Sequence, residues 1–229
     1  MRPYYDEGGI TIYHGDCREL MGGLGAQSVG LVVTDPPFYL PAAVHALRSA
    51  WPRSLSDLAL MAGYYREVFD DLLGVLRRDG GLYSFSDATS YAVFLSLAYP
   101  RFDRTQCIVW DKGVGGLGNG WRHSTEFLVH GAFSGTVYAT GFRRDLLRCP
   151  TVPSAQRDHP AEKPIGLLLA VMQAHPPLAI LDPFMGTGVV LQAAKLLGRR
   201  AIGMEIEERY CEVAARRLSQ GVLPLDWPA

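Results

Sequence analysis

The sequence predicts a doubly wound α/β fold with a mostly parallel sheet. Short apolar runs alternate with segments of helical hydrophobic spacing along nearly the whole chain, and such alternation is typical of parallel strands between two layers of helices. Near the C-terminal end, two apolar runs are joined through a glycine-rich turn and a helical segment, which is the order of a nucleotide-binding βαβ unit.

The N-terminal part begins with two expected strands, at 9–16 and 29–35, with a short helix from Arg18 between them. The pattern then predicts a helix over about 57–78, a strand at 80–87, a helix over about 89–99 and a strand at 105–110.

The C-terminal part begins with an apolar helix, for which Pro164 suits the first position. A strand at 178–182, the loop "PFMGTG", a helix over 189–198, a strand at 199–206 and a final helix from 207 follow. The glycine loop therefore comes late in the chain, whereas such a loop usually follows the first strand. Placing the C-terminal part before the N-terminal part restores an uninterrupted βα order, so the sequence reads as a circular permutation.

Composition and charge exclude several classes of protein. The 229 residues are 48% hydrophobic and 20% charged, as in ordinary soluble domains. No apolar run is long enough for a membrane span and the N-terminus lacks a signal-peptide pattern, so we expect a cytoplasmic protein. The four cysteines lack metal-site spacing and are expected to be reduced thiols. The net charge is −1, but residues 101–163 hold nine Lys/Arg against six Asp/Glu.

The loop "DPFMGTG" predicts a cofactor site. Gly186 and Gly188 allow a tight turn and a close backbone approach, and Asp182 ends the preceding strand. Glu205 ends the next strand, 17 residues after Gly188, where a carboxylate can accept both hydroxyls of a ribose. The nicotinamide fingerprint requires a third glycine where this chain has Leu191, so S-adenosylmethionine, which has no phosphates, is the better candidate.

Two further residues each have two interpretations. Asp16, in "HGDC", could accept a hydrogen bond from the adenine amino group of the cofactor or cap the helix that starts at Arg18. Lys163, in "HPAEKP", could pair with the carboxylate of the cofactor or be a solvated lysine at a helix start.

The stretch "LVVTDPPFYL" ends a buried strand in a segment suited to an amino group. Pro36 and Pro37 have no N–H and hold the chain extended after Asp35. The Asp35 carboxylate and the Pro36 carbonyl are then two acceptors for a planar NH2 group, and Phe38 offers a face for stacking a base. Accepting those hydrogen bonds would stabilise the charge that develops as the amine attacks a methyl sulfonium.

These motifs resemble those of the DNA amino-methyltransferases. "DPPF" looks like their catalytic motif and "DPFMGTG" like their S-adenosylmethionine motif. The order "GD", "DPPF", a variable stretch, "HPAEKP", "DPFMGTG" and Glu205 is similar to the permuted β group of the family, from about Pro3 to Leu218.

The resemblance implies a seven-stranded-type methyltransferase sheet in a single domain, 1–229. Residues 1–110 would form the catalytic half, 111–158 a short target-recognition insert and 159–229 the half that binds the cofactor. The base-binding and catalytic residues would be Asp35, Pro36, Pro37 and Phe38. The S-adenosylmethionine site would contain Asp16, Lys163, Asp182, Phe184, Gly186, Thr187, Gly188 and Glu205.

The expected activity is site-specific methylation of a base flipped out of double-stranded DNA. Asp35 favours adenine N6, because cytosine-N4 enzymes of the family often have Ser there, and Phe38 replaces the commoner Tyr. Cytosine N4 methylation, or a catalytically inactive homologue that binds cofactor or DNA, are the alternatives. An NAD-binding oxidoreductase is opposed by Leu191.

Basic and aromatic residues between the two halves are candidates for DNA contact. They are Lys112, Trp121, Arg122, His123, Arg143, Arg144 and Arg148. An exposed loop with ordinary surface charges would show the same composition. The resemblance also allows a homodimer and a cognate restriction endonuclease.

Overall fold

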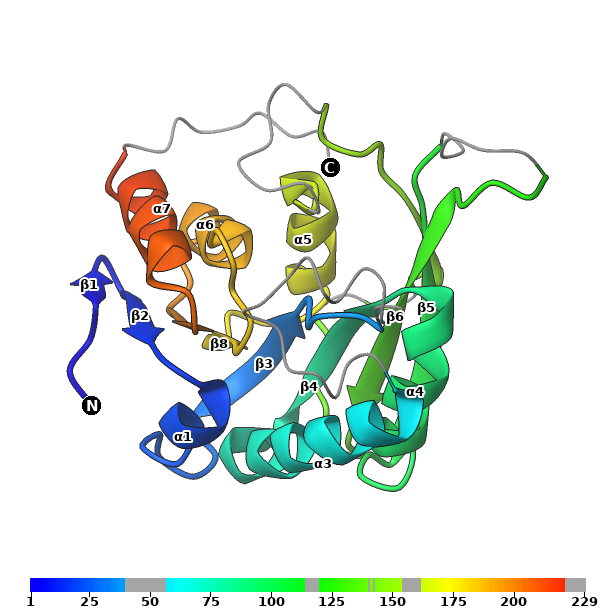
Figure 1. Ribbon diagram of the computed structural model, residues 1–229, viewed down its shortest axis with the longest axis horizontal. Coiled ribbons are helices and arrows are strands. Elements are labelled where there is room, and N and C mark those ends of the chain that lie inside the picture. The colour runs from blue at the N-terminus through cyan, green and yellow to red at the C-terminus, as the bar shows by residue number, and fades with distance from the viewer. Residues whose placement is uncertain (40–56, 114–119, 140, 142, 154–161, 221–229) are drawn as a thin grey trace.

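A sheet forms the centre of the computed structural model, and its nine described strands lie in the order β1-β2-β9-β8-β3-β4-β6-β5-β7 (Figure 1). The structure describes residues 1–39, 57–113, 120–139, 141, 143–153 and 162–220. Helices α5, α6 and α7 cover one face of the sheet, and α1, α3 and α4 cover the other. The mostly parallel α/β fold predicted from the sequence is confirmed.

The strands are β1 (Tyr5–Glu7), β2 (Ile10–His14), β3 (Val29–Thr34), β4 (Leu76–Ser86), β5 (Arg104–Asp111), β6 (Thr125–Ala132), β7 (Leu146–Arg148), β8 (Ile180–Asp182) and β9 (Ala201–Glu205). The helices are α1 (Cys17–Met21), α3 (Leu58–Val75), α4 (Ala88–Ala98), α5 (Ile165–Met172), α6 (Val189–Leu196) and α7 (Glu208–Ser219).

Most strands of the sheet run in the same direction. Strands β2, β9, β8, β3 and β4 are parallel neighbours. β6 lies antiparallel between β4 and β5, which gives β5 the common direction again, and β1 is antiparallel at the edge. The carboxyl ends of the parallel strands therefore meet along one edge of the sheet, the carboxyl edge.

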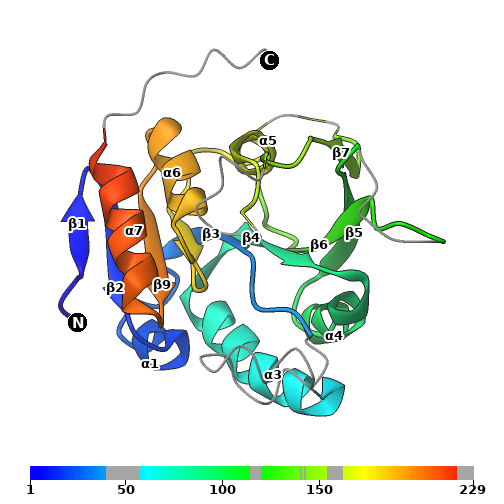
Figure 2. The same ribbon diagram turned by 45° about the horizontal axis from the view of Figure 1, so that its top comes forward.

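The central strand β3 is buried along its whole length because helices cover both of its faces. Leu31 and Val33 pack into the core under α5, α6 and α7, whereas Val29 and Val32 pack into the core around α3 and α4. Figure 2 shows α6 and α7 side by side over the part of the sheet that contains β2 and β9. Burial on two faces explains the unbroken apolar run that precedes Asp35.

The observed elements differ from the expected ones in several places, and the short strands β1 and β7 were also not expected. β4 starts at Leu76, four residues before the predicted strand. Pro164 is the N-cap of α5 rather than its first helical residue. β6 was not predicted, and it lies inside the expected insert 111–158 while pairing with both β4 and β5. That range therefore contributes a strand to the sheet itself.

Other sequence expectations concern the cysteines and the membrane. All four cysteines are free thiols. In the part of the chain that the structure describes, no helix is both long and apolar enough to cross a bilayer. Residues 159–161 of "HPAEKP", and 114–119, 140, 142 and 154–158 of the expected insert, lie outside the described residues.

Candidate active site

Three acidic residues gather where neighbouring strands end at the carboxyl edge. Asp35 follows β3, Asp182 ends β8 and Glu205 ends β9. The strands are adjacent in the order β9, β8, β3, so residues far apart in the chain meet because the sheet is parallel. Open α/β sheets bind ligands at this edge.

Asp182 fixes the start of the glycine loop from a buried position. Its Oδ1 accepts hydrogen bonds from Thr34 Oγ1 at 2.8 Å and from the backbone N–H of Phe184 at 3.1 Å. The side chain is 1% exposed, and burial raises the pKa of this carboxyl to about 7, a rise that the two hydrogen bonds oppose. Asp182 therefore holds the loop to β3.

Glu205 binds the middle of the same loop from the next strand. Its carboxylate accepts hydrogen bonds from the backbone N–H of Gly186 at 3.0 Å and of Glu207 at 2.8 Å. Burial raises the pKa of Glu205, and these backbone donors oppose the rise. A carboxylate has about four acceptor positions, so Glu205 retains capacity for a ligand hydroxyl.

The two glycines of the loop are required for different structural reasons. Gly186 has φ +51°, and a Cβ built there would meet none of the described atoms within 4 Å, so open space lies beside it. Gly188 has φ +79° and forms the N-cap of α6, where a Cβ would lie 2.7 Å from Cβ of Ala214. Gly186 thus borders a cradle, whereas Gly188 allows α7 to pack closely. Thr187, between them, is buried.

This loop fits an adenosine-bearing cofactor without phosphates. The open space beside Gly186 leaves room for a ligand, and Glu205 supplies an acceptor for ribose hydroxyls. The acidic residues Asp35, Asp182 and Glu205 at the same edge would repel a pyrophosphate, but they would attract a sulfonium cation.

The segment after Asp35 is anchored to the helices on one face of the sheet. Tyr65 of α3, which is fully buried, donates a hydrogen bond from its hydroxyl to the Pro37 carbonyl at 2.6 Å. The backbone N–H of Tyr39 donates to Ser90 Oγ of α4 at 2.8 Å. No hydrogen bond to the Pro36 carbonyl is found among the described residues. The Pro37 carbonyl is thus engaged, and the Pro36 carbonyl is the one available to a ligand.

Asp35 is part of a row of four alternating charges. Lys163 Nζ lies 2.8 Å from Asp35 Oδ2 and 3.1 Å from Glu126 Oε2, and Lys112 Nζ lies 2.6 Å from Glu126 Oε1. Asp35 Oδ1 is buried and has no hydrogen-bond partner among the described residues. The row therefore engages one oxygen of Asp35 and leaves the other for a ligand.

The pKa values in this row reflect burial opposed by pairing. Burial raises the pKa of Asp35, and the positive charge of Lys163 opposes that rise. Burial disfavours the charge on Lys163, yet Asp35 and Glu126 together raise its pKa above the usual value. Lys163 is therefore charged, and it stabilises the ionised form of Asp35.

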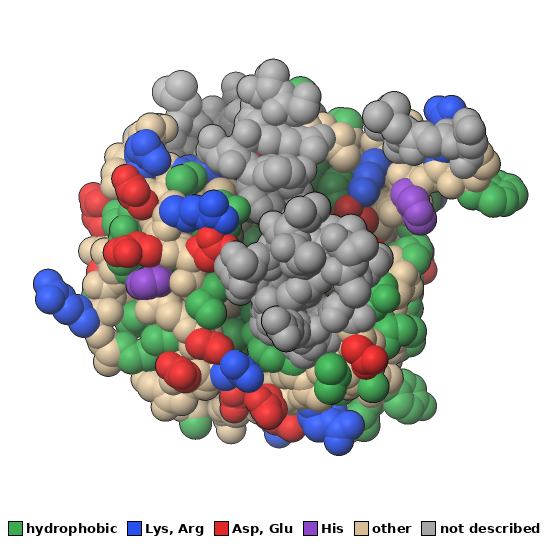
Figure 3. All heavy atoms as spheres, viewed as in Figure 1, with side chains coloured by type: hydrophobic (Ala, Val, Ile, Leu, Met, Phe, Trp, Pro, Cys, Tyr) green, Lys and Arg blue, Asp and Glu red, His purple; other side chains and the backbone are tan. Residues whose placement is uncertain are grey.

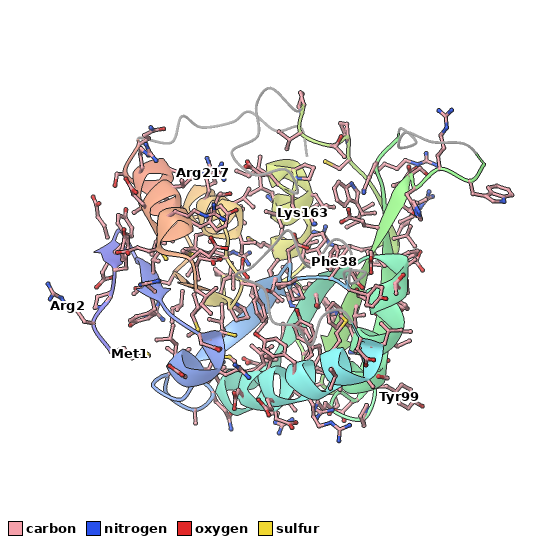
Figure 4. The ribbon with its side chains drawn as sticks, in the orientation of Figure 1. Met1, Arg2, Phe38, Tyr99, Lys163 and Arg217 are labelled. Atoms are coloured by element: carbon pink, nitrogen blue, oxygen red, sulfur yellow. The ribbon has the colours of Figure 1, made fainter. Side chains whose placement is uncertain are left out.

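Lys163 also borders the aromatic part of the site. Its Nζ lies 5.3 Å from the ring centroid of Phe38 and 5.3 Å from that of Phe85. Figure 4 shows Lys163 and Phe38 near each other at the centre of the molecule. Lys163, which was expected at the cofactor carboxylate, thus contacts Asp35 and lies beside Phe38.

Asp16 caps a helix, which is one of the two roles expected for it. It is the N-cap of α1, where its Oδ1 accepts a hydrogen bond from the backbone N–H of Arg18 at 2.9 Å. The guanidinium of Arg18 lies 2.7 Å from Oδ2 and lowers the pKa of Asp16. The carboxylate is still at the carboxyl edge, because the residue follows β2.

The candidates for DNA contact divide into exposed and engaged residues. The side chain of Trp121 is fully exposed on the loop before β6, and Arg122, His123 and Arg144 are also exposed. Lys112 is engaged instead, because it pairs with Glu126 and is only 19% exposed.

Two arginines of this group have structural partners. Arg143 donates hydrogen bonds to the carbonyls of Ala170 and Gln173 at 3.2 Å each, at the end of α5 that is farther from Lys163. Arg148, which is exposed, pairs with Asp111 at 3.4 Å. Figure 3 shows basic and acidic side chains interspersed on this face of the molecule, rather than one broad basic surface.

Comparisons with known proteins identify the family of this chain. A family model described as DNA methylase matches residues 143–216. Type II methyltransferase M.HinfI of Haemophilus influenzae is 42% identical over 247 residues, which cover 92% of this chain and 68% of that protein. The chain belongs to the DNA amino-methyltransferase family.

Other members of the DNA amino-methyltransferase family match nearly the whole chain. DNA adenine methyltransferase YhdJ of Escherichia coli is 26% identical over 247 residues, covering 91% of this chain and 82% of that protein. The crystal structure of the M1.HpyAVI-SAM complex superposes with a TM-score of 0.68 at 22% identity, covering 92% of this chain and all of the other. This last likeness confirms the fold.

The sequence did not indicate several residues of the site. Glu126 lies at the start of the unpredicted strand β6, and Tyr65 looks like any core residue of a helix. Thr34 reads as one more residue of a buried strand. None of the three has a sequence motif, and only their contacts with Lys163, Pro37 and Asp182 reveal what they do.

Proposed function

We propose that this protein transfers a methyl group from S-adenosylmethionine to the exocyclic amino group of a base in double-stranded DNA, with adenine N6 as the target. The observation that carries the proposal is Asp35, whose buried Oδ1 has no partner among the described residues. It lies one strand away from the glycine loop. Family membership supports methyl transfer to DNA, and the name of YhdJ, a DNA adenine methyltransferase, supports adenine as the target.

The base would be held by Asp35 and its neighbours. Oδ1 of Asp35 and the Pro36 carbonyl accept hydrogen bonds from the amino group, and Phe38 stacks on the ring. These acceptors stabilise the positive charge that develops on the nitrogen during attack. No base with a tuned pKa is needed beforehand, because the extra proton leaves the nitrogen after the transfer.

The cofactor would be held by the loop after β8. Glu205 accepts hydrogen bonds from ribose hydroxyls, and the backbone at Gly186 lines the space beside them. When bound, S-adenosylmethionine supplies a methyl group on a sulfonium, and the bonding electrons stay with sulfur as the amine takes the methyl carbon. The likeness to the M1.HpyAVI-SAM complex supports this choice of cofactor. Asp182 and Phe184 hold the loop in shape.

We also propose the circular permutation and the three-part organisation expected from the sequence. The order β2-β9-β8-β3 supports the permutation, because the C-terminal strands β8 and β9 lie between the N-terminal strands β2 and β3. The target-recognition insert would be narrower than 111–158, since β6 belongs to the sheet. Trp121, Arg122, His123, Arg144 and Arg148 remain candidates for DNA contact within it. A homodimer and a cognate restriction endonuclease are further expectations of the resemblance.

The test is to express the protein in cells that lack DNA amino-methylation and to sequence their DNA with detection of modified bases. Methyladenine at one short sequence motif is the expected result. Methylcytosine at its N4 position would overturn the choice of adenine. No modified base, together with tight binding of S-adenosylmethionine by the purified protein, would instead identify an inactive homologue.

A further inference from the structure

The row Lys112–Glu126–Lys163–Asp35 connects elements that are distant in the chain. Lys112 follows β5, Glu126 belongs to β6, Lys163 precedes α5 and Asp35 follows β3. Consecutive charges in the row lie 2.6 Å, 3.1 Å and 2.8 Å apart. Two positive and two negative charges alternate, so the row is electrically balanced.

Lys163 is the unusual member of the row because it is almost completely buried. Its side chain is 5% exposed, whereas lysine is rarely buried unless it is paired. Removing one partner of a buried pair is costly because it leaves an uncompensated charge. Lys163 therefore requires both carboxylates, and its position is determined by them.

We propose that Lys163 is a positioning residue for Asp35: it holds Oδ2 so that Oδ1 accepts the hydrogen bond from the target amine. Glu126, itself held by Lys112, fixes Lys163 from the other side. This inference rests on the proposed function and deepens it. It assigns Lys163 to the catalytic segment in place of the cofactor carboxylate.

The charges around Asp35 determine how each substitution changes its ionisation. Lys163 and Lys112 favour the ionised carboxylate, whereas Glu126 disfavours it. Asp182 and the hydroxyl of Tyr65 also interact with Asp35. Loss of Lys163 leaves burial and Glu126 opposed only by the more distant Lys112, and so raises the pKa of Asp35. Loss of the charge on Glu126 lowers it. If the row had a purely structural role, the two substitutions would not shift the pKa of Asp35 in opposite directions.

The experiment compares Lys163→Met and Glu126→Gln with the wild-type protein. For Lys163→Met, kcat at neutral pH should fall on the order of 100-fold, since misplacing a reacting group by about 1 Å has such an effect. The acidic limb of its kcat–pH profile should move to higher pH. For Glu126→Gln the limb should move to lower pH. The Kd for S-adenosylmethionine, measured by calorimetry, should stay within about twofold for both variants, since the ion pairs of the row are made outside the cofactor loop.

Arg217→Met is the matched control. Arg217 pairs with Glu162, next to Lys163 in the chain, at 3.0 Å with both side chains at most 12% exposed. Its loss should lower Tm without moving the pH profile. If Lys163→Met does not fold, the opposite shift expected of Glu126→Gln still tests the inference.

Two results would overturn the positioning role. One is a tenfold or larger rise in the cofactor Kd of Lys163→Met with an unchanged pH profile. That result would show that Lys163 binds the carboxylate of the cofactor instead. The other is wild-type kcat in that variant. If the wild-type protein transfers no methyl group, the proposed function fails. An NMR titration of the Asp35 carboxyl in the wild type and in Glu126→Gln would still test the row, because it needs no activity.

Discussion

Thr34 donates a hydrogen bond from its hydroxyl to Oδ1 of Asp182 over 2.8 Å, and so joins the ends of two neighbouring strands. Thr34 ends the strand that leads to Asp35, and Asp182 begins the glycine loop. The bond therefore fixes the start of the Asp35–Phe38 segment relative to the start of the glycine loop. Both partners are buried, at 3% and 1% exposure.

Thr34→Val should destabilise the protein and loosen the cofactor loop. The substitution keeps the shape of the side chain but removes a donor from a buried carboxyl, at a cost of about 1–3 kcal/mol. Chemical unfolding at pH 7 measures the loss. Thr34→Ser, which keeps the hydroxyl, is the control and should lose less. Equal stability of the valine variant and the wild type would show that the bond contributes nothing.

Asp35→Ala should abolish methyl transfer while largely sparing the affinity for S-adenosylmethionine, because the proposed ligand of Asp35 Oδ1 is the base and not the cofactor. Loss of a hydrogen-bonding group used in the transition state costs on the order of 100-fold or more in kcat. A tritiated methyl-transfer assay and calorimetry measure the two effects. Asp35→Asn keeps one oxygen acceptor and should retain more activity than the alanine variant. Wild-type turnover by Asp35→Ala would contradict the catalytic assignment.

Glu205→Ala should weaken cofactor binding rather than turnover at saturating cofactor. The carboxylate holds the backbone N–H groups of Gly186 and Glu207 as well as the expected ribose hydroxyls. Losing such charge-assisted bonds costs about 1.5–3 kcal/mol, which is on the order of 10- to 100-fold in Kd. Calorimetry with S-adenosylmethionine, and with NAD as the control ligand, checks this. Unchanged affinity would remove Glu205 from the cofactor site.

Alanine at the two loop glycines should have different effects. Gly186→Ala adds a methyl group to open space, so it should reduce cofactor affinity more than stability. Its strain at positive φ is roughly 1–2 kcal/mol. Gly188→Ala places a Cβ 2.7 Å from Ala214 and should lower Tm much more. Thermal melts and cofactor titrations of both variants measure the two effects. Equal losses of stability would contradict the open space beside Gly186.

Two buried histidines should make the protein sensitive to acid. His130 stacks on Tyr83 with ring centroids 4.2 Å apart, and the Tyr83 hydroxyl lies 2.9 Å from Nε2 of His175. Burial lowers the pKa of both histidines to about 4, from 6.5. The unfolded chain therefore binds more protons between pH 6.5 and 4, so stability present above pH 6.5 is lost as the pH falls through that window.

The expected loss between pH 7.5 and pH 5 is roughly 2 kcal/mol for each histidine, by linkage. Urea unfolding at the two pH values measures it. His130→Gln should be less stable than the wild type at pH 7.5 but should lose less on acidification. The same pH dependence in the variant and the wild type would show that His130 does not contribute to it.

Part of the fold could be predicted because it depends on local patterns. The apolar run of β3 and the helical spacing of α6 and α7 are visible in the sequence, and glycine in the turn before α6 is required by its positive φ. β6 could not be predicted, because its antiparallel place between β4 and β5 depends on long-range pairing. The same holds for β1 and β7, which are only three residues long.

The sequence by itself determined the chemistry of the site: an acid followed by two prolines and an aromatic ring, and a glycine loop with acidic residues at the strand ends. These features depend on residue type and short spacing, so they can be recognised in the sequence alone. The tertiary structure decided which groups act on one another. Lys163 is 128 positions from Asp35 in the chain, and only the packing of the start of α5 beside the end of β3 brings its charge to within 2.8 Å of that carboxylate.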